Sequence, residues 1–152
     1  MTLAEGGIAV RLIDVRAARI NAIALGKDSE PPDWAVKAEG EDAGAIRLMT
    51  AQDDRLVVQL TAMLTGRLMA IEIGLQGLYE VDKDSPGLLP ASEDTQSVLD
   101  RIPAEFRAEL AALATDDLYP YLRHAFHTIS TQIDPNSRIM LTPSDGWSVL
   151  TA

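Results

Sequence analysis

Two histidines, His124 and His127, are the side chains in this sequence best suited to metal or proton chemistry. Their i, i+3 spacing would place both near one face of a helix. A metal site needs at least one further well-placed ligand, and the sequence has no H-E-x-x-H or comparable motif. It also has no cysteine, which excludes thiolate ligands, cysteine nucleophiles and disulfides. We predict no metal site and interpret the histidine pair as solvent-facing or as part of an interface.

The remaining reactive side chains also lack a catalytic setting. No serine lies in a G-x-S-x-G elbow. Gly74 and Gly77 fall inside an expected strand, whereas phosphate-binding glycines lie between a strand and a helix N-terminus. The carboxylate pairs Asp53-Asp54 and Asp116-Asp117 are adjacent in expected turns and caps, where local backbone hydrogen bonds explain them. We predict that the protein is not an enzyme and needs no cofactor.

The chain around these residues has the composition of an ordinary globular domain. It has 152 residues, of which 47% are hydrophobic and 24% charged, and this length predicts one domain over residues 1–152. The formal net charge of −10 disfavours binding to nucleic acid. No stretch approaches the roughly 18 apolar residues of a membrane helix, and the first residues lack the basic region of a signal peptide. We therefore expect a cytoplasmic protein without membrane insertion.

The alternation of apolar residues predicts an antiparallel sheet within residues 8–81. The first strand, Ile8–Leu25, exceeds the usual length of about three to ten residues, so we expect a bulge, a bend or two shorter strands within it. A short strand follows over Trp34–Glu39, and Ile46–Thr50 extends it after a turn. Arg55–Leu64 and Arg67–Val81 form the clearest hairpin. Both faces of this hairpin are apolar, which predicts that one packs on helices and the other meets a partner subunit or a ligand.

The second half of the chain is predicted to be an acidic connection, a helix and a loop. Residues 82–115 form the connection, with short helices over Ser97–Ile102 and Pro103–Ala114; between residues 80 and 117 there are ten acidic and three basic residues. We interpret this charge as a solvated face, with a docking surface as the alternative. A long amphipathic helix over 116–134 begins at the cap Asp116-Asp117, and residues 135–152 form an extended C-terminal loop.

Three motifs suggest a relationship with a known family. Residues 118–123 read L-Y-P-Y-L-R at the start of the long helix, and residues 139–147 read I-M-L-T-P-S-D-G-W. This pair resembles the SecB family of protein-export chaperones, whose first long helix opens with F-P-Y-A-R and whose next loop carries L-x-L-x-P-x-N-F. Residues 72–79, E-I-G-L-Q-G-L-Y, are similar to the E-V-Q-Q-G-G-I-F segment of that family's fourth strand.

The resemblance implies an α+β fold, a four-stranded antiparallel sheet with a long helix packed on one face, assembled as a dimer of dimers. It implies an ATP-independent chaperone that binds unfolded or partly folded polypeptides in apolar grooves. Tyr121 and Phe126 are the expected oligomer interface. The expected groove residues are Trp34, Leu60, Ala62, Leu68, Met69, Ile71, Leu75, Leu78, Tyr79, Leu141 and Trp147; for each of them, plain core or oligomer packing is the alternative.

The sequence also departs from the family. Carboxylates on the first and fourth strands of the export chaperones contact the translocation ATPase; Glu72 matches the fourth-strand position, but the first-strand positions fall near Ala22 and Gly26. Because the chain ends at Ala152, we expect the helix that lids the family's groove to be absent. These departures suit a relative with a dedicated client, such as an antitoxin. The alternative is an oligomeric scaffold, or an adaptor for one folded partner, without chaperone activity.

Overall fold

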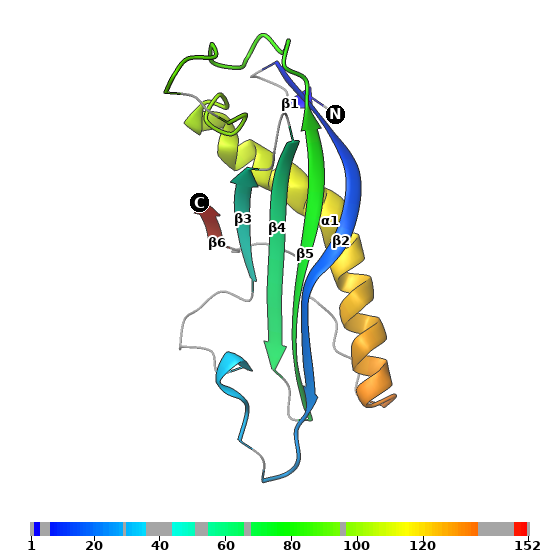
Figure 1. The fold of residues 1–152 in the computed structure, drawn as a ribbon. Helices are drawn as coiled ribbons and strands as arrows, with labels where there is room; N and C mark the ends of the chain where they lie inside the picture. Colours follow the sequence, from blue (N-terminus) through cyan, green and yellow to red (C-terminus); the bar gives the residue numbers. More distant parts are fainter. Residues whose placement is uncertain are drawn as a thin grey trace.

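The structure, a computed structural model, describes residues 2–3, 7–28, 30–35, 44–50, 55–65, 68–94, 97–136 and 148–151. Figure 1 shows one sheet of long, twisted strands with a single long helix running diagonally behind it. The strand order is β1-β2-β5-β4-β3-β6. The strands are β1 (Thr2–Leu3), β2 (Ile8–Ala24), β3 (Gly44–Thr50), β4 (Arg55–Thr65), β5 (Met69–Val81) and β6 (Ser148–Thr151).

The four longer strands pair antiparallel, which confirms the predicted fold class. β4 and β5 form the predicted hairpin, in register from the pair Arg55 and Glu80 to the pair Thr65 and Ala70. β2 pairs with β5 along its length, with register shifts between Leu12 and Asp14 and between Ala17 and Arg19. These irregularities are the expected bulges, which let a 17-residue strand follow the twist of its neighbour.

The structure differs from the sequence prediction in two segments, one near Trp34 and one at the C-terminus. Trp34 was assigned to a strand over 34–39, but it lies in a 3-10 helix, η1 (Asp33–Ala35), and residues 36–39 are outside the described residues. The amide of Ala35 donates to the carbonyl of Pro32 at 2.8 Å, closing a turn that follows two prolines. In the predicted C-terminal loop, Ser148–Thr151 instead form β6, which pairs parallel with β3.

The helical region was predicted as two helices separated at residue 115, and this was wrong. A single helix, α1 (Ala104–Ile133), runs through Asp116, Asp117 and Pro120. Residues 97–102 form turns rather than a helix. Asp117 resembles a cap in the sequence, but its carboxylate accepts a hydrogen bond from the Tyr79 hydroxyl at 2.9 Å, so the sheet holds it in the helix interior. α1 follows Pro103 and ends before Pro135, where the amide of Asp134 donates to the carbonyl of Ser130.

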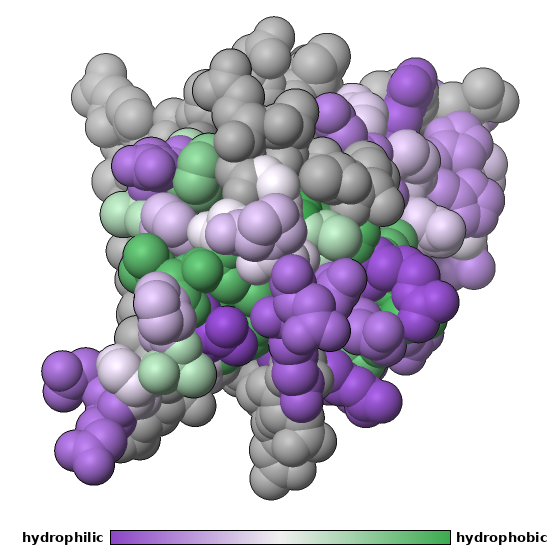
Figure 2. All heavy atoms as spheres, turned by 90° about the horizontal axis from the view of Figure 1, so that it is seen from above, coloured by the Kyte–Doolittle hydropathy of each residue, from purple (hydrophilic) through white to green (hydrophobic). Residues whose placement is uncertain are grey.

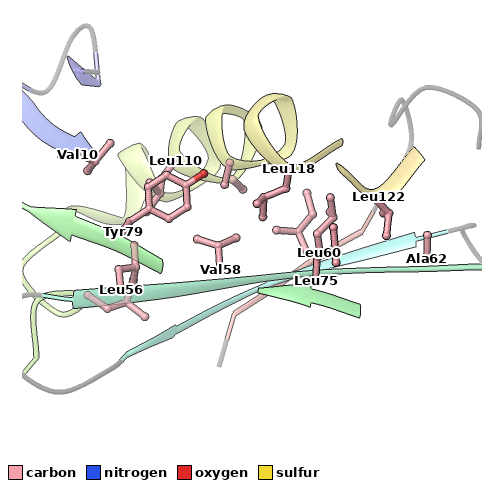
Figure 3. Close-up of a cluster of buried hydrophobic side chains, with 14 of the residues drawn as sticks. Val10, Leu56, Val58, Leu60, Ala62, Leu75, Tyr79, Leu110, Leu118 and Leu122 are labelled. Atoms are coloured by element: carbon pink, nitrogen blue, oxygen red, sulfur yellow. The ribbon is translucent and has the colours of Figure 1, made fainter. Parts of the chain in front are cut away.

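The core lies between α1 and one face of the sheet (Figure 3). Alternate residues of β4 and β5 point toward the helix, and Leu110, Leu118 and Leu122 of α1 meet them. α1 comes close to β5 at Gly77, where a Cβ atom would lie 3.0 Å from Leu118 Cδ2. Glycine at this position therefore lets the helix cross β5 at short distance.

The connection between β5 and α1 packs across one end of the sheet. Its residues Val98, Leu99 and Ile102 are buried, and the amide of Ala9 donates to its Ser85 Oγ at 3.0 Å. Its acidic side chains are exposed at Asp82, Asp84, Glu93, Asp94 and Asp100. Figure 2, which views the molecule from above, shows hydrophilic side chains around hydrophobic ones that remain visible between them. These exposed carboxylates fit the predicted solvated face.

Candidate functional site

Most of the predicted groove residues form the core beneath α1. Among the described residues of that set, the side chains that face the helix are at most 5% exposed. Figure 3 shows several of them pointing at α1 from β4 and β5. A client could reach them only if the helix moved away, because the helix occupies the space above them. The buried members are Leu60, Ala62, Met69, Ile71, Leu75 and Tyr79.

The other predicted groove residues lie in different places. Leu68, just before β5, is 46% exposed, and Trp34 in η1 is half-buried. Leu78 is half-buried on the sheet face that points away from α1. Leu141 and Trp147 lie outside the residues that the structure describes. The structure therefore does not bring the predicted set together as one groove within its described part.

The two residues assigned to an oligomer interface lie in different environments on α1. Tyr121 is 54% exposed, whereas Phe126 is fully buried in the core. Five residues advance a helix by about 140°, so the two side chains point in different directions. Only Tyr121 therefore offers side-chain surface to a second subunit.

The sheet face that points away from α1, here called the open face, is built by the alternate residues of β2–β5. Cross-strand partners share a face, so the register assigns its members. We predicted that the second face of the hairpin is apolar. The open face is instead mixed, with polar and charged side chains in most positions. Its members are Arg11, Asp14, Arg16, Arg19, Asn21 and Ile23 on β2; Ala70, Glu72, Gly74, Gln76, Leu78 and Glu80 on β5; Arg55, Val57, Gln59, Thr61, Met63 and Thr65 on β4; and Arg47 and Met49 on β3.

The charges of the open face are partly paired. Arg11 lies 3.2 Å from Glu80, and Arg19 Nε lies 2.9 Å from Glu72 Oε1. The same oxygen of Glu72 accepts from Asn21 Nδ2 at 2.9 Å, and its side chain is 15% exposed. To contact a translocation ATPase, Glu72 would first have to exchange these two interactions.

A small depression lies on the open face between β2, β4 and β5. Its volume is about 60 Å³, and its walls combine aliphatic and charged side chains. Ligand pockets measure roughly 300–1,000 Å³, so this depression can accept a single side chain but not a cofactor. Its lining residues are Asp14, Arg16, Val57, Gln76 and Leu78.

At the other end of the open face, η1 covers part of the sheet. Thr65 Oγ1 donates to the carbonyl of Ala35 at 3.1 Å, and Ala70 beside Thr65 is fully buried. The uncovered part of the open face therefore lies toward the connection between β5 and α1.

Exposed large apolar side chains are more numerous on β2 than on the predicted hairpin, where Leu68 is exposed. Ile13 is 38%, Ile20 53% and Ile23 41% exposed. Within the described residues, β1 pairs with β2 only at Ile8 and Ala9, so the outer edge of β2 beyond Ala9 has no strand partner there. The sequence signal for this surface was the run of isoleucines among arginines, but the bulges break the alternation that would have assigned their faces.

Among the titratable groups of the described residues, Tyr79 shows a strong pKa shift. Tyr79 is fully buried, and burial raises the pKa of its phenol well above the ordinary value of about 10. The hydrogen bond that Tyr79 donates to the Asp117 carboxylate shifts the pKa in the same direction. Tyr79 is thus a neutral donor that ties β5 to α1.

Neither the histidines nor the acidic residues assemble a metal site in the described part of the chain. His124 is exposed, and His127 has a buried Nδ1 without a hydrogen-bond partner among the described residues. No group of three or more histidine or carboxylate side chains that could hold a metal ion lies in that part. None of the described helices is both long enough and apolar enough to cross a membrane.

Comparison with known proteins identifies similar folds. Neither a protein-family profile nor a curated protein sequence matches this chain. A SecB-like chaperone of Mycobacterium tuberculosis, solved with a ChAD peptide from the HigA1 antitoxin, superimposes with a TM-score of 0.55 at 15% identity, over 88% of this chain and 89% of that one. A protein of unknown function from Streptococcus agalactiae superimposes with a TM-score of 0.57 at 12% identity, over 90% and 98% of the two chains. The chain therefore has a SecB-like fold, a four-stranded antiparallel sheet with one long helix packed on it.

Proposed function

We propose that this protein is an ATP-independent chaperone that binds extended, partly apolar segments of unfolded or partly folded polypeptides. The observation that carries the proposal is the surface of β2, where a long strand edge without a partner among the described residues carries three exposed isoleucines. An extended polypeptide can pair its backbone with such an edge and pack its apolar side chains beside it. The likeness of fold to a SecB-like chaperone solved with an antitoxin peptide supports a peptide client.

The proposal includes a cytoplasmic homo-oligomer built as a dimer of dimers, in which Tyr121 contributes to a contact between subunits. Tyr121 supports this part because it is a large side chain left 54% exposed, whereas the other aromatic residues of α1 are half-buried (Phe106 and Tyr119) or buried (Phe126). The client is a protein on its way to export or a dedicated partner such as an antitoxin. The proposal assigns no catalytic residue and no cofactor.

The test combines aggregation kinetics with light scattering after size exclusion. Wild-type protein, in stoichiometric excess over a reduced, unfolded test client, should suppress the client's aggregation without ATP and should elute with it as a complex. Absence of both effects would contradict the proposal. The same elution profile gives the mass of the free particle and so separates a dimer from a tetramer.

An oligomeric scaffold, or an adaptor for one folded partner, is the second candidate. The observation that favours it is the polar character of the open face, where ion pairs and glutamine side chains occupy positions that a general apolar groove would fill with aliphatic residues. An adaptor would leave unfolded clients to aggregate while capturing its folded partner. The aggregation assay therefore distinguishes the two functions.

A further inference from the structure

The open face of the sheet is locally basic although the chain as a whole is acidic. It carries five of the 13 lysine and arginine residues of the protein, all of them arginines, against three carboxylates, whereas the formal net charge of the chain is −10. Two arginines, Arg11 and Arg19, are paired with Glu80 and Glu72. Three arginines and one carboxylate, Asp14, lie outside these two ion pairs and determine the net charge of the rest of the face.

The three remaining arginines have no ion pair within the described residues. Arg16 donates to Gln76 Oε1 at 3.2 Å, which leaves its positive charge uncompensated by that bond. Arg47 and Arg55 are exposed. Asp14 lies two residues from Arg16, and its Oδ1 accepts from the amide of Val15 at 2.9 Å. The balance of free charge on this face is therefore positive.

The register arranges these arginines in rows across the sheet. One row reads Arg16, Gln76, Gln59 and Arg47, with an arginine at each end. Because neighbouring strands are about 4.8 Å apart, the backbones of Arg16 and Arg47 are separated by about 14 Å across the sheet. Four residues further along β5 and β4, Arg11, Glu80 and Arg55 form another row.

An apolar row lies between the two charged rows. Its members on β5, β4 and β3 are Leu78, Val57 and Met49, with Asp14 as the partner on β2. Leu78 and Val57 line the depression of about 60 Å³, which has room for one side chain. The open face thus contains a small apolar depression with arginines on both sides of it.

We propose that the uncovered part of the open face docks an acidic segment of a client polypeptide, with an apolar side chain over Val57 and Leu78 and neighbouring carboxylates paired with Arg16, Arg47 and Arg55. Arginine suits this role because its guanidinium can donate two parallel hydrogen bonds to one carboxylate. This inference rests on the proposed function, since it specifies the charge of part of the client. This docking contact would be separate from the proposed client contact at Ile20, whose side chain lies on the other face of the sheet.

The inference is tested by fluorescence anisotropy with a labelled peptide in which glutamates flank a central leucine on both sides. A matched peptide replaces every glutamate with glutamine. The glutamate peptide should bind more tightly, and its affinity should fall as salt concentration rises, because exposed charges are screened. The variant R16Q/R47Q/R55Q should weaken its binding by about threefold to a hundredfold, because it removes three exposed ion pairs whose contributions add.

The matched control is Arg123→Gln, which removes an exposed arginine from α1 and changes the net charge in the same direction. It should leave the affinity within about twofold, because its side chain is not on the open face. Equal affinity for the two peptides, or an equal loss in the control and the triple variant, would overturn the inference. Self-association of the wild type that disappears in the triple variant would overturn it in favour of a second copy of this chain as the occupant.

The aggregation assay with a client free of acidic clusters separates this inference from the proposed function. If the protein protects that client but binds both peptides equally, the chaperone function stands and the acidic docking site is excluded. If it binds the glutamate peptide selectively but protects no client, the docking site stands and the chaperone function is excluded.

Discussion

The hydroxyl of Tyr79 on β5 donates a hydrogen bond of 2.9 Å to Asp117 Oδ2 in the middle of α1. This contact joins the sheet to the helix at a buried phenol and a half-buried carboxylate. It also explains why the acidic pair at 116–117 lies inside a continuous helix instead of starting one. Removal of the donor leaves a partly desolvated carboxylate without this partner.

Tyr79→Phe should lower the free energy of unfolding by about 1–2 kcal/mol, because the Asp117 carboxylate loses its donor while the ring packing is retained. Chemical denaturation with urea measures the difference. Tyr121→Phe is the control, because it removes a phenol hydroxyl from α1 at an exposed position outside the Asp117 contact. Equal losses in the two variants would show that the Tyr79–Asp117 bond makes no special contribution.

The same bond predicts a dependence of stability on alkaline pH. Burial and the Asp117 bond raise the pKa of Tyr79 in the folded state above the unfolded value of about 10. The folded state thus holds the proton more tightly, so this contribution is complete below about pH 10 and is lost as the pH rises further. The free energy of unfolding of the wild type should fall more steeply above that pH than that of Tyr79→Phe. Parallel curves from pH 9 to 11 would contradict the assignment.

Gly77→Ala should destabilise the fold by about 1–3 kcal/mol, because the added methyl overpacks the contact between β5 and α1. Its Cβ would lie 3.0 Å from both Leu118 Cδ2 and Tyr79 Cε2. Gly74→Ala on the same strand is the control: its Cβ would face the open side, with Thr61 Oγ1 at 3.3 Å as the nearest atom. Thermal unfolding should place Gly77→Ala below Gly74→Ala, and the reverse order would contradict the close helix crossing.

Phe126 and Tyr121 should separate folding from assembly. Phe126→Ala should lower the free energy of unfolding by about 3–5 kcal/mol, since it opens a cavity in the core. Tyr121→Asp should change it by no more than about 0.5 kcal/mol in the isolated subunit, because the side chain is exposed. If Tyr121 lies in a contact between subunits, Tyr121→Asp elutes later than the wild type on size exclusion. An unchanged elution volume would remove Tyr121 from the proposed interface.

Ile20→Ser should weaken the suppression of aggregation, because it removes an exposed aliphatic side chain from the proposed client surface on β2. Leu89→Ser is the matched control: Leu89 is 45% exposed, comparable with the 53% of Ile20, but lies in the connection after β5. We expect the protective ratio of protein to client to rise only for Ile20→Ser. An equal rise for both variants would point to general surface hydrophobicity and against a client site on β2.

The strands were the most predictable part of this protein. The hairpin of β4 and β5 follows from alternation that is continuous over both arms, and the excess length of β2 indicated the bulges that the register contains. The long helix was harder, because its local signals were misleading. An acidic pair and a nearby proline are typical of a helix start, but the bond from Tyr79 to Asp117 and the burial of Ala114 and Leu118 make these residues the interior of α1.

The sequence by itself determined which side chains of β4 and β5 share a face, because the two-residue period of a strand follows from backbone geometry. It could not determine which of the two faces α1 would cover. That choice depends on how α1 packs on the sheet, through contacts such as that of Gly77 with Leu118, residues far apart in the chain. Once α1 covers the face of Leu60 and Tyr79, the opposite face and the edge of β2 are left to meet solvent or a partner. The burial of a side chain is a property of its neighbours in space, and only the tertiary structure supplies them.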